Sequence, residues 1–133
     1  MRAAEFVEVG GELMLATFCS PESRFRSAVG RAYYGVYHEA CELLTALGAP
    51  FDSKRHGSTT DALFALARSK DDELFRDVAV AIKSLYAGRQ KADYRFDDTS
   101  SQSFRSDQFS MNQVLDGKWI LTKLDLLRQK HVR

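Results

Sequence analysis

The stretch SPESRFRSAVGRAYYGVYHEACELLTALGAP, residues 20–50, decides the fold. It contains the only two prolines of the chain, Pro21 and Pro50, and proline interrupts helix interiors, so the two bound the segment between them. At 3.6 residues per turn, the apolar residues of this segment fall on one side of a helix. They are Val29, Ala32, Tyr33, Val36, Ala40, Leu43, Leu44 and Leu47. A helix beginning at Pro21, capped by Ser20 and stopped at Gly48, is therefore predicted.

Four more segments have helical spacing, and no segment of useful length alternates between apolar and polar residues as a strand does. They are residues 3–19, 60–70, 72–94 and 111–133, and a polar, turn-rich stretch follows at 95–106. Helices with short connections predict an all-α fold, an antiparallel bundle of about five helices in a single domain over residues 1–133.

The ends of these helices are predicted from local signals. Gly10 and Gly11 predict a break in the first segment, because glycine weakens a helix interior. A serine or threonine can accept a hydrogen bond from the first turn of a helix. The candidates are Ser58, Thr59 or Thr60 for segment 60–70, and Ser106 or Ser110 for the last helix.

Composition limits the function classes. Of 133 residues, 44% are hydrophobic and 28% charged, which is typical of a globular domain, and the net charge of +1 gives no global attraction to nucleic acid. Cys19 and Cys41 are too few for a disulfide framework, and the three histidines lack metal-ligand spacing. The chain has no span for a membrane and does not start like a signal peptide. We expect a cytoplasmic protein without a cofactor.

Arg31 and His38 lie seven residues apart, close to two helical turns, on the polar side of the helix. Ser27, Tyr34 and Glu42 share this side. The two side chains can flank one phosphodiester, or meet their counterparts across the two-fold axis of a dimer. The structural alternative is a solvated surface on which Arg31 pairs with an acid such as Glu42 or Asp93.

These residue types suit RNA cleavage without a metal. A histidine with a pKa near neutrality, His38, can exchange a proton with the 2′-hydroxyl or the leaving oxygen. Arg31 can bind the phosphate through two hydrogen bonds and stabilise developing charge. Tyr34 can stack on a base or bond to a phosphate. Cys41 with His38 would make a nucleophilic pair, although a cysteine on a helix is more often a buried thiol.

A second polar cluster lies at the end of segment 72–94. Arg89 and Asp93 share a helix side at positions i and i+4, with Lys91, Tyr94 and Arg95 close by. They form either a phosphate-binding patch or a local ion pair at a helix end.

The densest basic spot of the chain is a short loop. Lys54, Arg55 and His56 follow one another there. They can touch a nucleic-acid backbone, or they are simply solvated.

The motifs SAVGRAYYGVYHEACELL, KRHGSTTDALF and LYAGRQKADY, in this order between Ser27 and Tyr94, resemble those of the HEPN domain family, in particular its small stand-alone prokaryotic group. The resemblance implies a helical bundle, a homodimer and a role in toxin–antitoxin or defence systems, often beside a minimal nucleotidyltransferase. Many HEPN proteins are metal-independent ribonucleases with an Arg-x(4–6)-His motif, which Arg31 and His38 match.

Two functions follow from this interpretation. The first is a HEPN ribonuclease with Arg31 and His38 as catalytic residues, and with substrate bound by Ser27, Tyr34, Arg89, Asp93 and Tyr94. The second is a non-catalytic HEPN module that binds a nucleotide, RNA, a nucleotidyltransferase or an antitoxin. It would bind through the face of Arg31, Tyr34 and His38 and through the helix end with Arg89, Asp93 and Tyr94.

Overall fold

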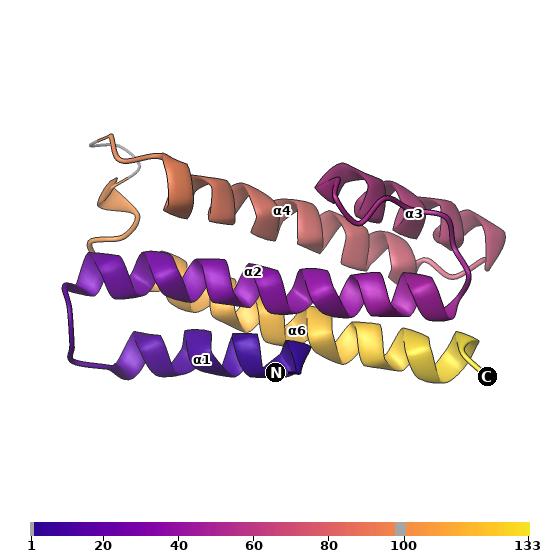
Figure 1. Ribbon diagram of the computed structural model, residues 1–133, viewed down its shortest axis with the longest axis horizontal. Coiled ribbons are helices and arrows are strands. Elements are labelled where there is room, and N and C mark those ends of the chain that lie inside the picture. Colours follow the sequence, from indigo (N-terminus) through magenta and orange to yellow (C-terminus); the bar gives the residue numbers. More distant parts are fainter. Residues whose placement is uncertain (1, 98–100) are drawn as a thin grey trace.

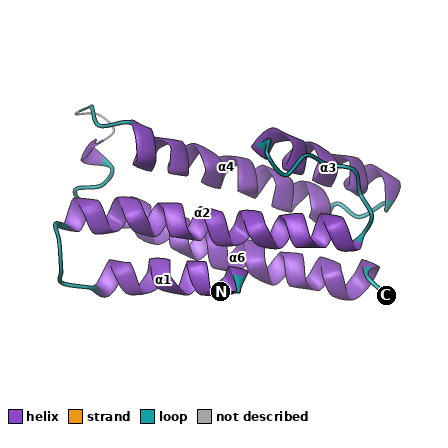
Figure 2. Cartoon of the chain, viewed as in Figure 1, coloured by secondary structure: helices purple, strands orange, loops and turns teal. Residues whose placement is uncertain are grey.

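Helices make up the regular secondary structure of the computed structural model, which describes residues 2–97 and 101–133 (Figure 1). They are α1 (Ala3–Leu15), α2 (Pro21–Ala46), α3 (His56–Ser69), α4 (Leu74–Tyr94) and α6 (Gln108–His131). No strand occurs in the described residues, which confirms the predicted all-α fold (Figure 2). None of the described helices is both long and apolar enough to cross a bilayer. Of the polar stretch 95–106, residues 98–100 lie outside the described residues.

Helix α2 has the ends that its local signals predict. The Ser20 hydroxyl accepts a hydrogen bond from the backbone N–H of Ser23, 3.2 Å away, and Pro21 occupies the first helical position. Beyond the last turn, Gly48 adopts a φ of +68°, a left-handed conformation that costs glycine little. The predicted apolar side is buried from Val29 to Leu44, and Leu47 is half-buried.

Helix α1 runs through Gly10 and Gly11 without the predicted break. The physical reason is close contact with α2. A Cβ atom on Gly10 would lie 2.9 Å from the carbonyl oxygen of Ala28, and one on Gly35 of α2 would lie 2.6 Å from that of Ala3. One glycine on each helix therefore lets the two backbones pack closely, and this contact outweighs the low helix propensity of glycine.

Two predicted caps are wrong. Helix α3 begins at His56, so the Ser58 hydroxyl instead accepts from the Asp52 N–H at 2.8 Å, and Thr60 donates to the Gly57 carbonyl at 3.1 Å. Helix α6 begins at Gln108 after Asp107, without a side-chain cap. Neither candidate for α6, Ser106 or Ser110, is its N-cap, and Ser110 is buried within the first turn.

The core lies around α2, which contacts every other labelled helix. Its larger cluster joins α2, α3, α4 and α6 and includes Tyr33, Leu44, Leu63, Phe75 and Leu124. A smaller cluster joins α1, the first half of α2, the end of α4 and α6, and includes Val7, Phe25, Ala92, Phe104 and Val114. One side of α2, between α1 and α4, is left open to solvent, and it carries the candidate site.

Candidate functional site

Arg31 and His38 lie on the exposed side of α2, and one aromatic ring contacts both of them. The ring of Phe6, from α1, stacks on the His38 imidazole with 5.8 Å between the ring centroids. The guanidinium carbon of Arg31 lies 6.0 Å from the centroid of the same Phe6 ring. The two side chains therefore share a hydrophobic neighbour instead of a hydrogen bond.

The acids suggested as partners of Arg31 have other partners. The Oδ2 atom of Asp93 lies 2.9 Å from Nε of Arg89, and Oε2 of Glu42 lies 3.9 Å from Nη2 of Arg128. Within residues 2–97 and 101–133, Arg31 and His38 form neither a hydrogen bond nor an ion pair. The polar groups of both side chains are thus available to a ligand.

A surface depression of about 430 Å³ collects four of the predicted residues. Ser27, Arg31 and Tyr34 of α2 line it together with Asp93 of α4, and side chains of α1 close its other edge. His38 lies outside this depression, in a neighbouring groove of about 570 Å³. The structure therefore joins α2 and the end of α4 into one polar surface, with His38 two helical turns further along α2.

Arg89 connects the two helices beneath this surface. Its Nη2 donates a hydrogen bond to the Tyr34 hydroxyl at 2.8 Å, and its Nε forms the ion pair with Asp93. The guanidinium carbon lies 5.4 Å from the centroid of the Tyr34 ring and 5.3 Å from that of Tyr94. Arg89 is buried, whereas Tyr94 is exposed. Arg89 therefore positions Tyr34 and Asp93, and its own charge is already compensated within the chain.

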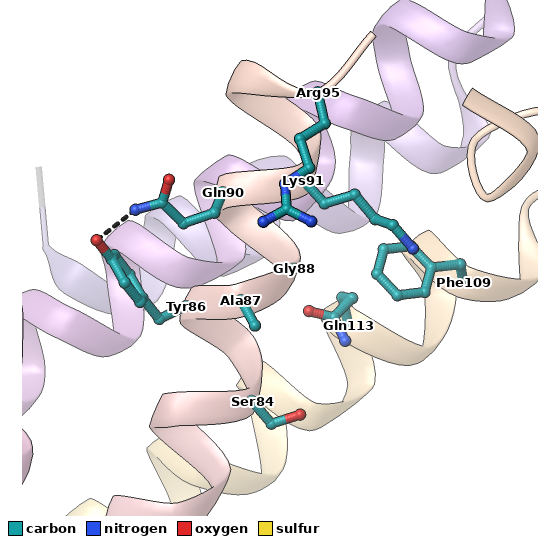
Figure 3. A pocket seen from close by; sticks show the side chains of 9 residues that line it. All are labelled: Ser84, Tyr86, Ala87, Gly88, Gln90, Lys91, Arg95, Phe109 and Gln113. Carbon is teal, nitrogen blue, oxygen red and sulfur yellow. Dashed lines mark hydrogen bonds between the residues drawn. The ribbon is translucent and has the colours of Figure 1, made fainter. Parts of the chain in front are cut away.

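Lys91 and Arg95, predicted to lie close to Arg89, face a different side of α4. They line a depression of about 630 Å³ together with Phe109 of α6 (Figure 3). The ammonium group of Lys91 donates to the Ser103 hydroxyl at 2.9 Å and lies 5.1 Å from the centroid of the Phe109 ring. The end of α4 thus carries two separate polar surfaces, because residues two apart on a helix point in nearly opposite directions.

Cys41 lacks the environment of an activated nucleophile. It is half-buried, and this burial raises the pKa of its thiol. Its Sγ lies 4.0 Å from the Thr59 hydroxyl. Since a reactive cysteine needs a lowered pKa, the raised pKa of Cys41 argues against the Cys41–His38 alternative, although both residues line the groove of about 570 Å³.

An aromatic cluster surrounds His56, and it was not predicted from the sequence. The imidazole lies among Tyr33 and Tyr37 of α2 and Tyr86 of α4, with ring centroids 5.5, 4.6 and 5.1 Å away. Its Nδ1 forms a hydrogen bond with the Tyr33 hydroxyl. Burial, together with the nearby charge of Arg89, lowers the pKa of His56. His56 is therefore a partly buried, neutral residue rather than part of a solvated basic loop.

One signal in the sequence points toward this cluster. Tyr33 and Tyr37 are four residues apart on α2, so they present two hydroxyl-bearing rings on one side of the helix. A buried tyrosine hydroxyl needs a hydrogen-bond partner. The positions of His56 and Tyr86, 23 and 53 residues after Tyr33, are set by the tertiary fold.

Comparisons of the chain with protein-family models, curated proteins and solved structures give no match.

Proposed function

We propose that the chain is a HEPN-type ribonuclease that cleaves single-stranded RNA without a metal ion, as the toxin of a toxin–antitoxin or defence system. The observation that supports this most is the state of Arg31 and His38. Both are exposed on one face of α2, and neither has a polar partner in the described residues. A cation and a proton-transfer group that are both free to meet a ligand are what phosphodiester cleavage requires.

In the proposed reaction, the 2′-oxygen of the substrate attacks the adjacent phosphorus, and the bond from phosphorus to the 5′-oxygen breaks. His38 takes the proton of the 2′-hydroxyl and then gives it to the departing 5′-oxygen. Arg31 binds the non-bridging phosphate oxygens, whose charge grows as the new bond forms. The products are a 2′,3′-cyclic phosphate and a 5′-hydroxyl end.

The residues around Arg31 and His38 are suited to binding single-stranded RNA. The Phe6 ring, between the two polar groups, and the half-buried Tyr34 ring offer surfaces on which bases can stack. The Ser27 hydroxyl, one helical turn before Arg31, can bond to a further phosphate. Asp93 faces the same depression, so it can accept a hydrogen bond from a base or a ribose hydroxyl.

The second candidate is a non-catalytic HEPN module that binds RNA, a nucleotide, or a nucleotidyltransferase or antitoxin partner. The observation that favours it is the position of Phe6. Its ring contacts both Arg31 and His38, and these two side chains line separate depressions, so a single chain does not direct them at one point. Binding an extended ligand does not need such convergence, whereas acid–base catalysis at one phosphate does.

The deciding experiment is incubation of total RNA and tRNA with the purified protein in EDTA, beside His38→Ala and Arg31→Ala. Arg68→Ala is the matched control, because Arg68 is an exposed arginine on α3, away from this face. We expect cleavage products with 2′,3′-cyclic phosphate ends from the wild type and from Arg68→Ala, and a loss of at least about 100-fold in rate in the other two.

Circular dichroism checks that all four proteins are folded. If no protein cleaves, yet only Arg31→Ala binds RNA more weakly than Arg68→Ala, the binding module is the correct interpretation. If His38→Ala cleaves at the wild-type rate, the catalytic assignment is wrong.

A further inference from the structure

The outer side of α6 carries a partly exposed apolar stripe, in which the ammonium group of Lys123 lies 5.6 Å from the centroid of the Trp119 ring. Leu115, Trp119 and Leu126 are 52%, 44% and 37% exposed, although they are large hydrophobic residues. They recur at positions i, i+4 and i+11, and Thr122 fills position i+7. They point away from the buried side of α6, which comprises Ser110, Gln113, Val114, Gly117, Ile120, Leu124 and Leu127. A continuous exposed stripe of this kind marks an interaction surface.

The sequence of this stripe is close to its own reverse. Residues 115–126 read LDGKWILTKLDL, so that from either end the order is leucine, aspartate, a third residue and lysine. The centre of this inverted pattern lies between Ile120 and Leu121. A second α6 turned end to end about this centre therefore places its Leu126 level with Leu115, and its Thr122 level with Trp119.

The charged residues follow the same pattern along both edges of the stripe. At 100° per residue, Asp116 and Lys123 lie along one edge, and Lys118 and Asp125 along the other. The two members of each pair are seven residues apart, about 10 Å along the axis, which is too far to pair within one helix. Within α6, Asp125 accepts a hydrogen bond from the Gln129 amide at 2.9 Å, and the ammonium group of Lys123 lies 5.6 Å from the centroid of the Trp119 ring. The spacing of the four charges therefore suits ion pairs with a partner helix.

We propose that α6 of one chain packs antiparallel against α6 of a second copy, with Leu115, Trp119, Thr122 and Leu126 in the seam. Around a two-fold axis perpendicular to the helices, the same edges of the two helices meet. Asp116 then lies within two residues, about 3 Å along the axis, of the partner's Lys123, and Lys118 is equally close to the partner's Asp125. Two charge pairs on each edge flank the apolar seam.

The antiparallel direction is favoured over the parallel one by side-chain size and by the helix dipoles. Antiparallel packing sets the large Trp119 of each chain against the small Thr122 of the other, whereas parallel packing puts two tryptophans at one level. Antiparallel helix dipoles also attract, whereas parallel ones repel. Parallel packing would in addition pair Asp116 with Lys118 of the partner chain instead of with its Lys123. Substitutions that swap these charges can therefore distinguish the two directions.

This surface is separate from the proposed ribonuclease face. Gly117, on the buried side of α6, packs against Ala32, on the buried side of α2. Arg31 and His38 lie on the exposed side of α2, so pairing through α6 leaves both accessible. Dimerisation through α6 can therefore be tested independently of RNA cleavage.

The test is the dimerisation constant of the full-length chain, measured by sedimentation over a dilution series. Trp119 is the only tryptophan, so the position of its fluorescence emission follows burial of the seam in the same samples. Asp116→Lys sets like charges against each other and should raise the dissociation constant at least about tenfold. Adding Lys123→Asp restores both pairs on that edge, so the double variant should return to within about threefold of the wild type.

The control double variant, Asp116→Lys with Lys118→Asp, has the same composition and net charge. In an antiparallel pair it creates repulsion on both edges, so it should remain as weak as the single variant or weaker. If only this control variant recovered the wild-type dissociation constant, the two helices would be parallel, and the proposal would be overturned. A wild-type chain that stays monomeric, or a dimer that all three variants leave unchanged, would also overturn it. Of the three substituted positions, Asp116 and Lys118 are exposed and Lys123 is half-buried, and circular dichroism checks that each variant is folded.

Discussion

The Nη2 atom of Arg89, on α4, lies 2.8 Å from the hydroxyl oxygen of Tyr34, on α2. A guanidinium group has only donors, so the tyrosine oxygen accepts this bond. Because Arg89 is buried, the bond offsets part of the cost of removing its charge from water. The pair fixes the end of α4 beside α2, and it thereby holds Asp93 at the depression that Arg31 lines.

Removal of this acceptor should destabilise the fold. In Tyr34→Phe the ring remains, but the Arg89 donor loses its partner, so the free energy of unfolding should fall by about 1–3 kcal/mol in urea titration. The matched control is Tyr94→Phe. The ring of Tyr94 contacts the same guanidinium, but the residue is 64% exposed, so we expect a change within about 0.5 kcal/mol. Equal losses in the two variants would contradict a structural role for the hydroxyl.

Alanine substitution of the adjacent glycines Gly10 and Gly11 of α1 should change the stability of the protein in opposite directions. A Cβ atom on Gly10 would lie 2.9 Å from the Ala28 carbonyl oxygen, a backbone atom that cannot move alone. One on Gly11 would lie 3.9 Å from the ammonium group of Lys118, the end of a flexible side chain. Thermal unfolding should show a loss of about 1–3 kcal/mol for Gly10→Ala and a gain of up to about 1 kcal/mol for Gly11→Ala. A loss in both would mean that α1 tolerates no added side-chain volume.

Mild acid should destabilise the protein through His56. Burial, then the charge of Arg89, lowers the pKa of His56 below its ordinary value of 6.5. Unfolding restores the ordinary pKa, so the unfolded chain binds a proton that the folded chain excludes. The contribution of neutral His56 to stability is therefore present above about pH 6.5, and it is lost as the pH falls toward the folded-state pKa of His56. Denaturant titrations between about pH 7 and pH 5 should show this fall, and His56→Gln should flatten it.

A second lowered pKa does not interfere with this measurement. A hydrogen bond from His131 lowers the pKa of Asp72 below its ordinary value of 3.8, so its contribution is lost only in stronger acid. If wild type and His56→Gln lost equal stability between the two pH values, protonation of His56 would not be coupled to folding.

The sequence predicts those parts of the fold that depend on neighbours along the chain. Ser20, Pro21 and Gly48 mark the ends of α2, and the apolar spacing between them identifies its buried side, because cap and period are local properties. The spacing of Arg31 and His38 likewise places both on one exposed face. The unbroken course of α1 through Gly10 could not be predicted, since it depends on the Ala28 carbonyl of another helix.

The same limit applies to the candidate site. Arg89 and Asp93 form the ion pair that their spacing suggests, but Tyr34, the acceptor for Arg89, comes 55 residues earlier. His56 belongs to a basic run in the sequence, yet the fold surrounds it with three tyrosines. Burial and hydrogen-bond partners at these positions depend on how α2, α3 and α4 pack, which single-sequence periodicity does not encode.

The contact of Phe6 with both Arg31 and His38 makes the open face of α2 a property of two helices. A ligand that spans the two polar groups also rests on α1, so part of its binding free energy opposes local opening of that helix. Occupancy of the face and amide hydrogen exchange in α1 are then thermodynamically linked, and each should respond to the other. A substitution that loosens α1 would accordingly weaken binding at a surface that it never touches.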